Sequence, residues 1–100
     1  MIGSVGLGTL ASSLATQSRV AETAAANIAN AVTPDYQSQR GQPVSLTPSG
    51  VGYVALPPQG EVDLGREAVN LTIASQAYAA SAKAYSSVDT TERKGLAILA

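Results

Sequence analysis

The chain has 100 residues, enough for one domain at most. Its formal net charge is −1 and only 13% of its residues are charged, so it lacks the basic surface that nucleic-acid binding requires. It has no cysteine and no histidine, which excludes a disulfide framework, a thiol nucleophile and the commonest general base.

The side chains that usually fill protein cores are scarce in this sequence. It has no Phe, no Trp, four Tyr and one Met, and much of its 45% hydrophobic content is alanine. Burial of apolar surface stabilises a fold by about 25 cal/mol per Å², and alanine has little surface to bury. Two alanine-rich helices would barely offset the entropy of the chain. We therefore predict that the protein completes its fold by packing against copies of itself or against partners.

The first third of the chain predicts a helix over 8–32. Its apolar residues recur at alternating steps of three and four, which is typical of a helix that packs along one face. The residue before Pro34 avoids the helical region, so the helix should end there. Glycines at positions 3, 6 and 8 predict a flexible start over 1–7. The expected packing face consists of Leu7, Leu10, Leu14, Gln17, Ala21, Ala24, Ile28 and Ala31.

The segment 33–62 contains all five prolines and reads as an irregular connector. Within it, GVGYVAL over 50–56 alternates in the manner of a strand. Two interpretations are open, a short strand or an extended loop lying on the helices. We expect the loop, because an isolated two-stranded hairpin is marginal in water.

A second helix is predicted over 63–94, about 48 Å long at 1.5 Å per residue. Asp63 is a good N-cap, and Glu67 in the first turn is favoured by the helix dipole. Gly95 should end the helix and leave a tail over 95–100. The predicted fold is all-α: an antiparallel two-helix coiled-coil hairpin with an irregular Pro/Gly-rich connector. The second packing face comprises Leu64, Leu71, Ala74, Tyr78, Ser81, Tyr85, Val88 and Leu99.

The sequence offers little for catalysis or metal binding. It has no GxSxG elbow, and its amino-terminal glycines lack the lysine of a phosphate-binding loop. The carboxylate pairs at 63/67 and 89/92 have the spacing of solvated helix faces. We expect no enzyme, no cofactor and no metal site.

The amino terminus, MIGSVGLGTLASSLATQSR, does not have the pattern of a secretory signal, since no basic residue precedes Arg19. No stretch approaches the ~18 continuous apolar residues of a membrane span. We expect no membrane insertion, and any export should proceed without a cleaved signal peptide.

Two asparagines, Asn27 and Asn30, interrupt the apolar run AAANIANAV, and their spacing places them on one helix face. Either they cap the helix end by bonding backbone groups, or they pair across an interface between helices. Asn70 has the same two possibilities, an amide that sets register in a helix interface or a residue at its rim.

The segment AAANIANAVTPDY closely resembles the Ala-Asn-Asn-Ile-Ala-Asn-x-x-Thr-x-Gly-Tyr motif of bacterial flagellar axial proteins, which build the rod, the hook and the hook junctions. Ala26 replaces the first asparagine of the motif, and Asp35 replaces its glycine. The residues that match it are Asn27, Ile28, Ala29, Asn30, Thr33 and Tyr36.

A second match lies at the carboxyl end, where VDLGREAVNLTIASQAYAASAKAYSSVD resembles the closing helix of the same family. The stretch GYVALP before it resembles the proximal-rod members. The matching residues of the closing helix are Val62, Asp63, Leu64, Glu67, Val69, Asn70, Leu71, Ala74, Ala77, Tyr78, Ala80, Lys83 and Asp89.

The resemblance implies a structural subunit of the flagellar basal-body rod, in the periplasm-spanning part of the flagellum. Its first and last helices would pair and stack with other axial proteins after passage through the flagellar type III export apparatus. The asparagines would then set register around the joined helix ends. Rival hypotheses are a small helical adaptor that binds rod or export proteins without polymerising, and an amphipathic membrane-surface helix, which the few basic residues disfavour. The expected interface residues are Leu7, Leu10, Leu14, Asn27, Ile28, Ala29, Asn30, Thr33, Tyr36, Val69, Asn70, Leu71, Ala74, Tyr78, Tyr85 and Val88.

Overall fold

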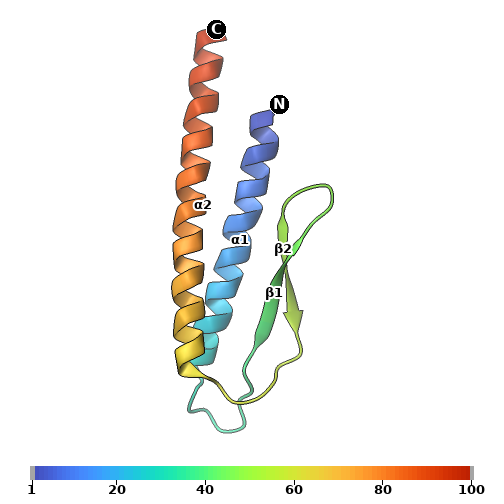
Figure 1. Cartoon of the computed structure of the whole chain (residues 1–100), viewed down its shortest axis with the longest axis vertical. Coiled ribbons are helices and arrows are strands. Elements are labelled where there is room, and N and C mark those ends of the chain that lie inside the picture. Colours follow the sequence, from blue (N-terminus) through green and yellow to red (C-terminus); the bar gives the residue numbers. More distant parts are fainter. Residues whose placement is uncertain (1, 100) are drawn as a thin grey trace.

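The computed structural model of the protein describes residues 2–99 and contains two helices and one β-hairpin (Figure 1). In chain order these are α1 (Ile2–Ala29), β1 (Arg40–Ser45), β2 (Val51–Leu56) and α2 (Leu64–Leu99). The helices have 28 and 36 residues, so the fold is mostly helical. The expectation of an all-α fold is wrong in one respect, because the connector contains a two-stranded antiparallel sheet.

Helix α1 differs from its predicted bounds at both ends. It begins at Ile2, so the glycines of the first turns do not produce the flexible start expected over 1–7, of which Met1 lies outside the described residues. It ends at Ala29, before the predicted residue 32. The reason is a tight turn, in which the N–H of Ala31 bonds to the carbonyl of Ile28 and that of Thr33 to the carbonyl of Asn30. These bonds reach back three residues and replace the helical ladder.

Helix α2 begins as predicted and ends later. The Asp63 carboxylate accepts a hydrogen bond from the Arg66 N–H at 3.0 Å, which confirms Asp63 as the N-cap. The helix continues through Gly95 to Leu99, so the predicted tail over 95–100 is wrong for the described residues. A glycine costs about 1 kcal/mol relative to alanine in a helix, which weakens this end without breaking it.

The hairpin pairs β1 with β2 from Arg40 opposite Leu56 to Ser45 opposite Val51. A 3.0 Å bond from the Leu46 N–H to the Gly50 carbonyl closes its turn, and Gly50 has the positive φ of 103° that glycine adopts without strain. The expectation of an extended loop here is therefore wrong. The hairpin is not isolated, since β2 lies along α1.

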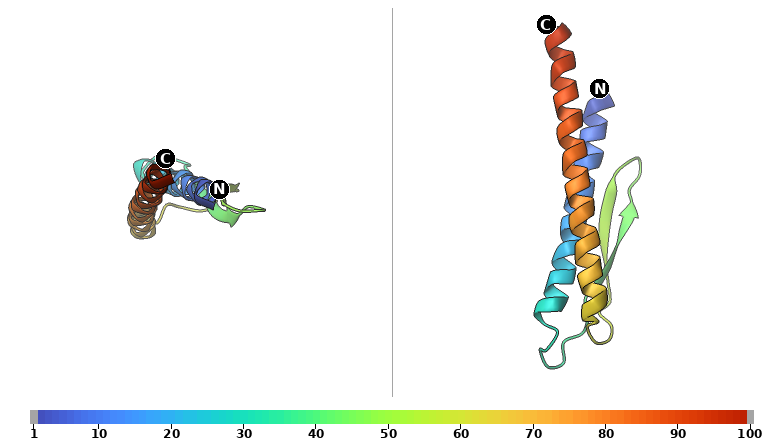
Figure 2. Two further views of the ribbon diagram at one scale, coloured as in Figure 1. Left: turned by 90° about the horizontal axis from the view of Figure 1, so that it is seen from above. Right: turned by 60° about the vertical axis from the view of Figure 1, so that its left-hand side comes forward.

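The three parts of the molecule lie in a row, with α1 between α2 and the hairpin (Figure 2). The two helices run in opposite directions, and α2 continues beyond the start of α1 (Figure 1). The molecule measures 62 × 24 × 14 Å, and its radius of gyration of 17.2 Å exceeds the roughly 13 Å of a compact domain this long. In the part of the chain that the structure describes, α2 packs against α1 and not against the strands.

The hydrophobic core is very small. Ala24 and Ala74 are the buried apolar side chains of the described residues, and both are alanines. The accessible surface is 6738 Å², whereas a compact protein of this mass exposes about 5,300 Å². The chain thus leaves about 1,400 Å² more surface in solvent than a compact fold would. Its other buried residues are polar, namely Thr16, Asn27, Ser38 and Glu67.

Candidate assembly surface

Asn27 lies in the last turn of α1 and has no exposed surface. Its Nδ2 donates to the carbonyl of Gln39 at 2.9 Å, and its Oδ1 accepts from the Gln39 N–H at 2.7 Å and from the Tyr36 hydroxyl at 3.0 Å. These three bonds hold the segment after the helix against its side. Within the chain, Asn27 bonds backbone groups beyond the helix end, and its pairing across an interface with another helix stays a prediction.

Asn30 has a local role in the turn after α1. Its Nδ2 donates to the carbonyl of Ala26 at 2.9 Å, and its Oδ1 accepts from the Thr33 hydroxyl at 3.2 Å. The cap interpretation is the correct one for this residue, and pairing across an interface is again not observed. Asp35 closes the turn with φ of 60°, a left-handed conformation that glycine adopts more readily than other residues.

The hairpin attaches to α1 through hydroxyl groups that bond to its backbone. Ser12 Oγ accepts from the Val51 N–H at 3.0 Å, and Thr16 Oγ1 donates to the Val51 carbonyl at 3.1 Å. In an antiparallel sheet, opposite residues alternate between pairs that exchange backbone hydrogen bonds and pairs that do not. Leu46 and Gly50 are hydrogen-bonded, so the next pair, Ser45 and Val51, is not. The backbone N–H and carbonyl of Val51 therefore point away from β1. The hydroxyls of Ser12 and Thr16 on α1 therefore provide hydrogen-bond partners for the two backbone groups of Val51 at the edge of the sheet.

Tyr53 extends this contact along α1. Its hydroxyl lies 2.8 Å from Thr23 Oγ1, and the Arg19 guanidinium lies over its ring at 5.1 Å from the centroid. The ring also covers Gly41 on β1, where an added Cβ atom would clash with the Tyr53 hydroxyl. Glycine at 41 is thus required by the close approach of the ring.

The contact between the helices is made by small and polar side chains. Ala24 and Ala74 are buried in it, and the hydroxyls of Ser13 and Ser81 lie 3.2 Å apart across it. Small side chains let the two backbones approach closely but bury little apolar area. The larger residues of the predicted packing faces are only partly buried, among them Leu7, Leu10, Leu14, Ile28, Leu71, Tyr85 and Val88.

Several large apolar side chains of α2 face solvent. Val69 is 56% exposed and Ile73, one turn later on the same face, is 58% exposed. Tyr78 is 46% exposed on another side of the helix. Ile73 was not among the predicted interface residues, although its spacing of four from Val69 signals a shared face. At the carboxyl end, where α2 extends past α1, the exposed residues are Leu96, Ile98 and Leu99.

The predicted interface residues thus fall into three groups. Asn27 and Ala74 are buried within the chain. Asn30, Tyr36 and the partly buried residues of the packing faces stabilise the chain itself. The remaining ones lie at the surface and are free to contact another molecule, namely Ala29, Thr33, Val69, Asn70 and Tyr78.

Other features of a binding site are sparse. No helix in residues 2–99 is long and apolar enough to cross a membrane. Nor do the described residues bring three His, Cys, Asp or Glu side chains together in a way that could hold a metal ion. Comparison with protein-family models and with curated proteins gave no match to this chain.

Proposed function

We propose that this protein is a structural subunit of the bacterial flagellar basal-body rod, built in through its paired first and last helices after type III export. The observation that carries the proposal is the contrast between a core of two alanines and the large apolar side chains exposed on α2. A chain of this kind gains stability when another molecule covers α2. The resemblance of two segments to the motifs of the flagellar axial family is the reason for naming the rod as that assembly.

The geometry of the first motif supports the assignment. Asn27 and Tyr36, both motif residues, bond to each other and fix the turn after α1. Asp35 stands where the motif has glycine, and its φ of 60° is a conformation natural to glycine. The motif therefore has a physical role here, because its residues form the turn that reverses the chain direction at the end of the first helix.

The proposed mechanism is folding coupled to assembly. A standard protein interface buries about 800 Å² on each partner, so the excess surface of about 1,400 Å² is enough for one full interface with a neighbouring molecule. The helix pair would form a coiled coil with its neighbours, with the Val69–Ile73 face of α2 covered by an adjacent subunit. The entropy lost when the helices become ordered is then offset by burial of apolar surface against a neighbour, which the isolated chain lacks.

Purified basal bodies from the source bacterium test this function. The proposal expects the chain in the rod fraction, and it expects Ile73→Lys to reduce its incorporation by about tenfold or more. Thr72→Lys is the matched control, since it adds the same charge at an adjacent exposed position and should incorporate normally. Absence of the wild-type chain from basal bodies would refute the proposal.

The alternative is a helical adaptor that binds rod or export proteins without entering the rod. The short connector favours it, because residues 30–63 separate the helices and their central part, 40–56, forms a hairpin that packs on α1 rather than a projecting domain. Under this alternative the protein is recovered with soluble export components and is missing from basal bodies.

A further inference from the structure

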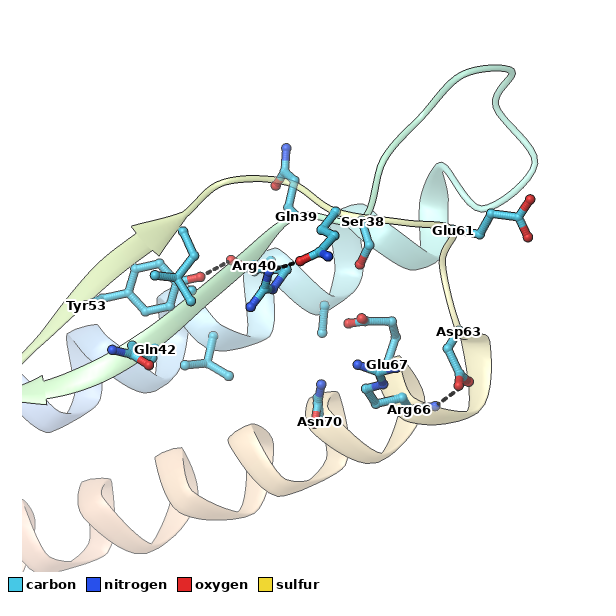
Figure 3. Close-up of a pocket in the computed structure, with 16 residues that line it drawn as sticks. Ser38, Gln39, Arg40, Gln42, Tyr53, Glu61, Asp63, Arg66, Glu67 and Asn70 are labelled. Carbon is cyan, nitrogen blue, oxygen red and sulfur yellow. Dashed lines mark hydrogen bonds between the residues drawn. The ribbon is translucent and has the colours of Figure 1, made fainter.

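A polar cleft lies between the base of the hairpin and the first turns of α2 (Figure 3). Its volume is about 360 Å³. It is lined by Thr23 and Ala24 on α1, by Ser38 in the connector, by Arg40 on β1, by Tyr53 on β2, and by Glu67 and Asn70 on α2. It is separate from the exposed apolar face of α2.

Two polar residues that line the cleft have little exposed surface. Glu67 is only 7% exposed, and its side chain forms no hydrogen bond or ion pair with any residue of the described chain. Ser38 is 8% exposed, and its hydroxyl likewise has no partner within residues 2–99. Figure 3 shows both groups directed into the same space. Neither the Glu67 carboxylate oxygens nor Ser38 Oγ is among the fully enclosed atoms that lack a partner, so both groups are reached from the cleft and have acceptor capacity free for a ligand.

The basic residues of the cleft do not neutralise Glu67. The Arg40 guanidinium donates to Gln59, and the Arg66 side chain is exposed and lies beyond ion-pair distance of Glu67. A metal ion is also a poor fit, because the neighbouring acid Asp63 caps α2 and no three-ligand cluster exists among the described residues. The chemistry left is an organic cation that carries N–H donors.

We infer that this cleft binds the guanidinium group of an arginine side chain from a neighbouring protein molecule. A guanidinium presents a planar fork of donors that matches a carboxylate in two parallel hydrogen bonds. The Glu67 carboxylate accepts this fork, and Ser38 Oγ and the Asn70 amide lie on the same cleft to accept further N–H groups. The inference rests on the proposed function only in taking the neighbour to be another subunit.

The test measures thermal melting of the full chain by circular dichroism, at a protein concentration where the helix signal has reached its plateau. Methylguanidinium chloride should raise the melting temperature, because a ligand that binds the folded state stabilises it. Two controls should not raise it: N-methylurea, the neutral molecule of the same shape, and tetramethylammonium chloride, which matches the ionic strength but has no N–H donor. An equal response to tetramethylammonium would overturn the inference.

Substitution of Glu67 tests its role as the acceptor of the ligand. Glu67→Gln should melt at about the wild-type temperature without ligand, since the carboxylate oxygens are already reached from the cleft. It should also bind methylguanidinium at least ~10-fold more weakly, in line with the loss of a charge-assisted hydrogen bond. Glu22→Gln, at an exposed position of α1, is the matched control and should keep the full response. If Glu67 acts only by its favourable interaction with the helix dipole, Glu67→Gln should have a lower melting temperature than the wild type and bind methylguanidinium equally well. That result would contradict the inference.

The source of the cation is decided by two further probes. N-acetyl-arginine methylamide should bind at least as tightly as methylguanidinium, and spermidine should bind more weakly. Tighter binding of spermidine would overturn the assignment to a protein side chain. Because these measurements use the purified chain, they can succeed or fail independently of its presence in basal bodies.

Discussion

Replacement of Asn27 by alanine is the sharpest perturbation of the intramolecular contacts. The side chain makes three hydrogen bonds from a fully buried position, two to the Gln39 backbone and one to the Tyr36 hydroxyl. At a net contribution of about 1 kcal/mol for each bond, Asn27→Ala should lower the free energy of unfolding by about 3 kcal/mol. That is a large share of the 5–15 kcal/mol typical of whole domains.

Urea unfolding followed by circular dichroism, at one protein concentration for all variants, measures this loss. Asn30→Ala is the matched control, because its two bonds stay within the local turn; it should cost less than about 1 kcal/mol. Asn27→Asp keeps the acceptor oxygen but sets a carboxylate oxygen against the Gln39 carbonyl, so it should be at least as destabilising as alanine. Equal stability of the Asn27→Ala and Asn30→Ala variants would refute the reasoning.

Three further substitutions test the turn and the docking of the hairpin. Asp35→Gly should raise the free energy of unfolding by up to about 1 kcal/mol and Asp35→Ala should lower it, because φ is 60° there; the reverse order in urea unfolding would contradict this conformation. Gly41→Ala should destabilise by about 1–3 kcal/mol, since the new Cβ displaces the Tyr53 ring, and its tyrosine fluorescence should change. A variant as stable as the wild type would mean that the ring does not cover residue 41. Ser12→Ala should speed amide hydrogen exchange at Val51 by about tenfold, as expected for the loss of one hydrogen bond. Unchanged exchange would show that the hydroxyl does not protect this amide.

The helices were predictable because their signals are local. Periodic apolar residues place both helices, and the N-cap at Asp63 follows from the residue type and its position. The ends were less predictable. Gly95 lies in a helix that continues past it, and the end of α1 depends on bonds in the turn at 30–33.

The hairpin and the role of Asn27 were beyond local reasoning because their partners lie far along the chain. Val51 is held by hydroxyls 35 and 39 residues away, and nothing in GVGYVAL points to them. Asn27 bonds to Gln39, 12 residues later, and the sequence alone left its partner open. The buried state of Glu67 depends likewise on how α2 and the connector meet. Long-range contacts of this kind require the fold itself.

We propose that the chain reaches its full stability by sharing the exposed sides of its helices with other molecules. Circular dichroism and sedimentation velocity of the purified chain over a wide range of concentration test this dependence. Helix content and the urea midpoint should rise with concentration as the sedimentation coefficient increases. A monomer that melts cooperatively at the same urea concentration throughout the range would contradict it.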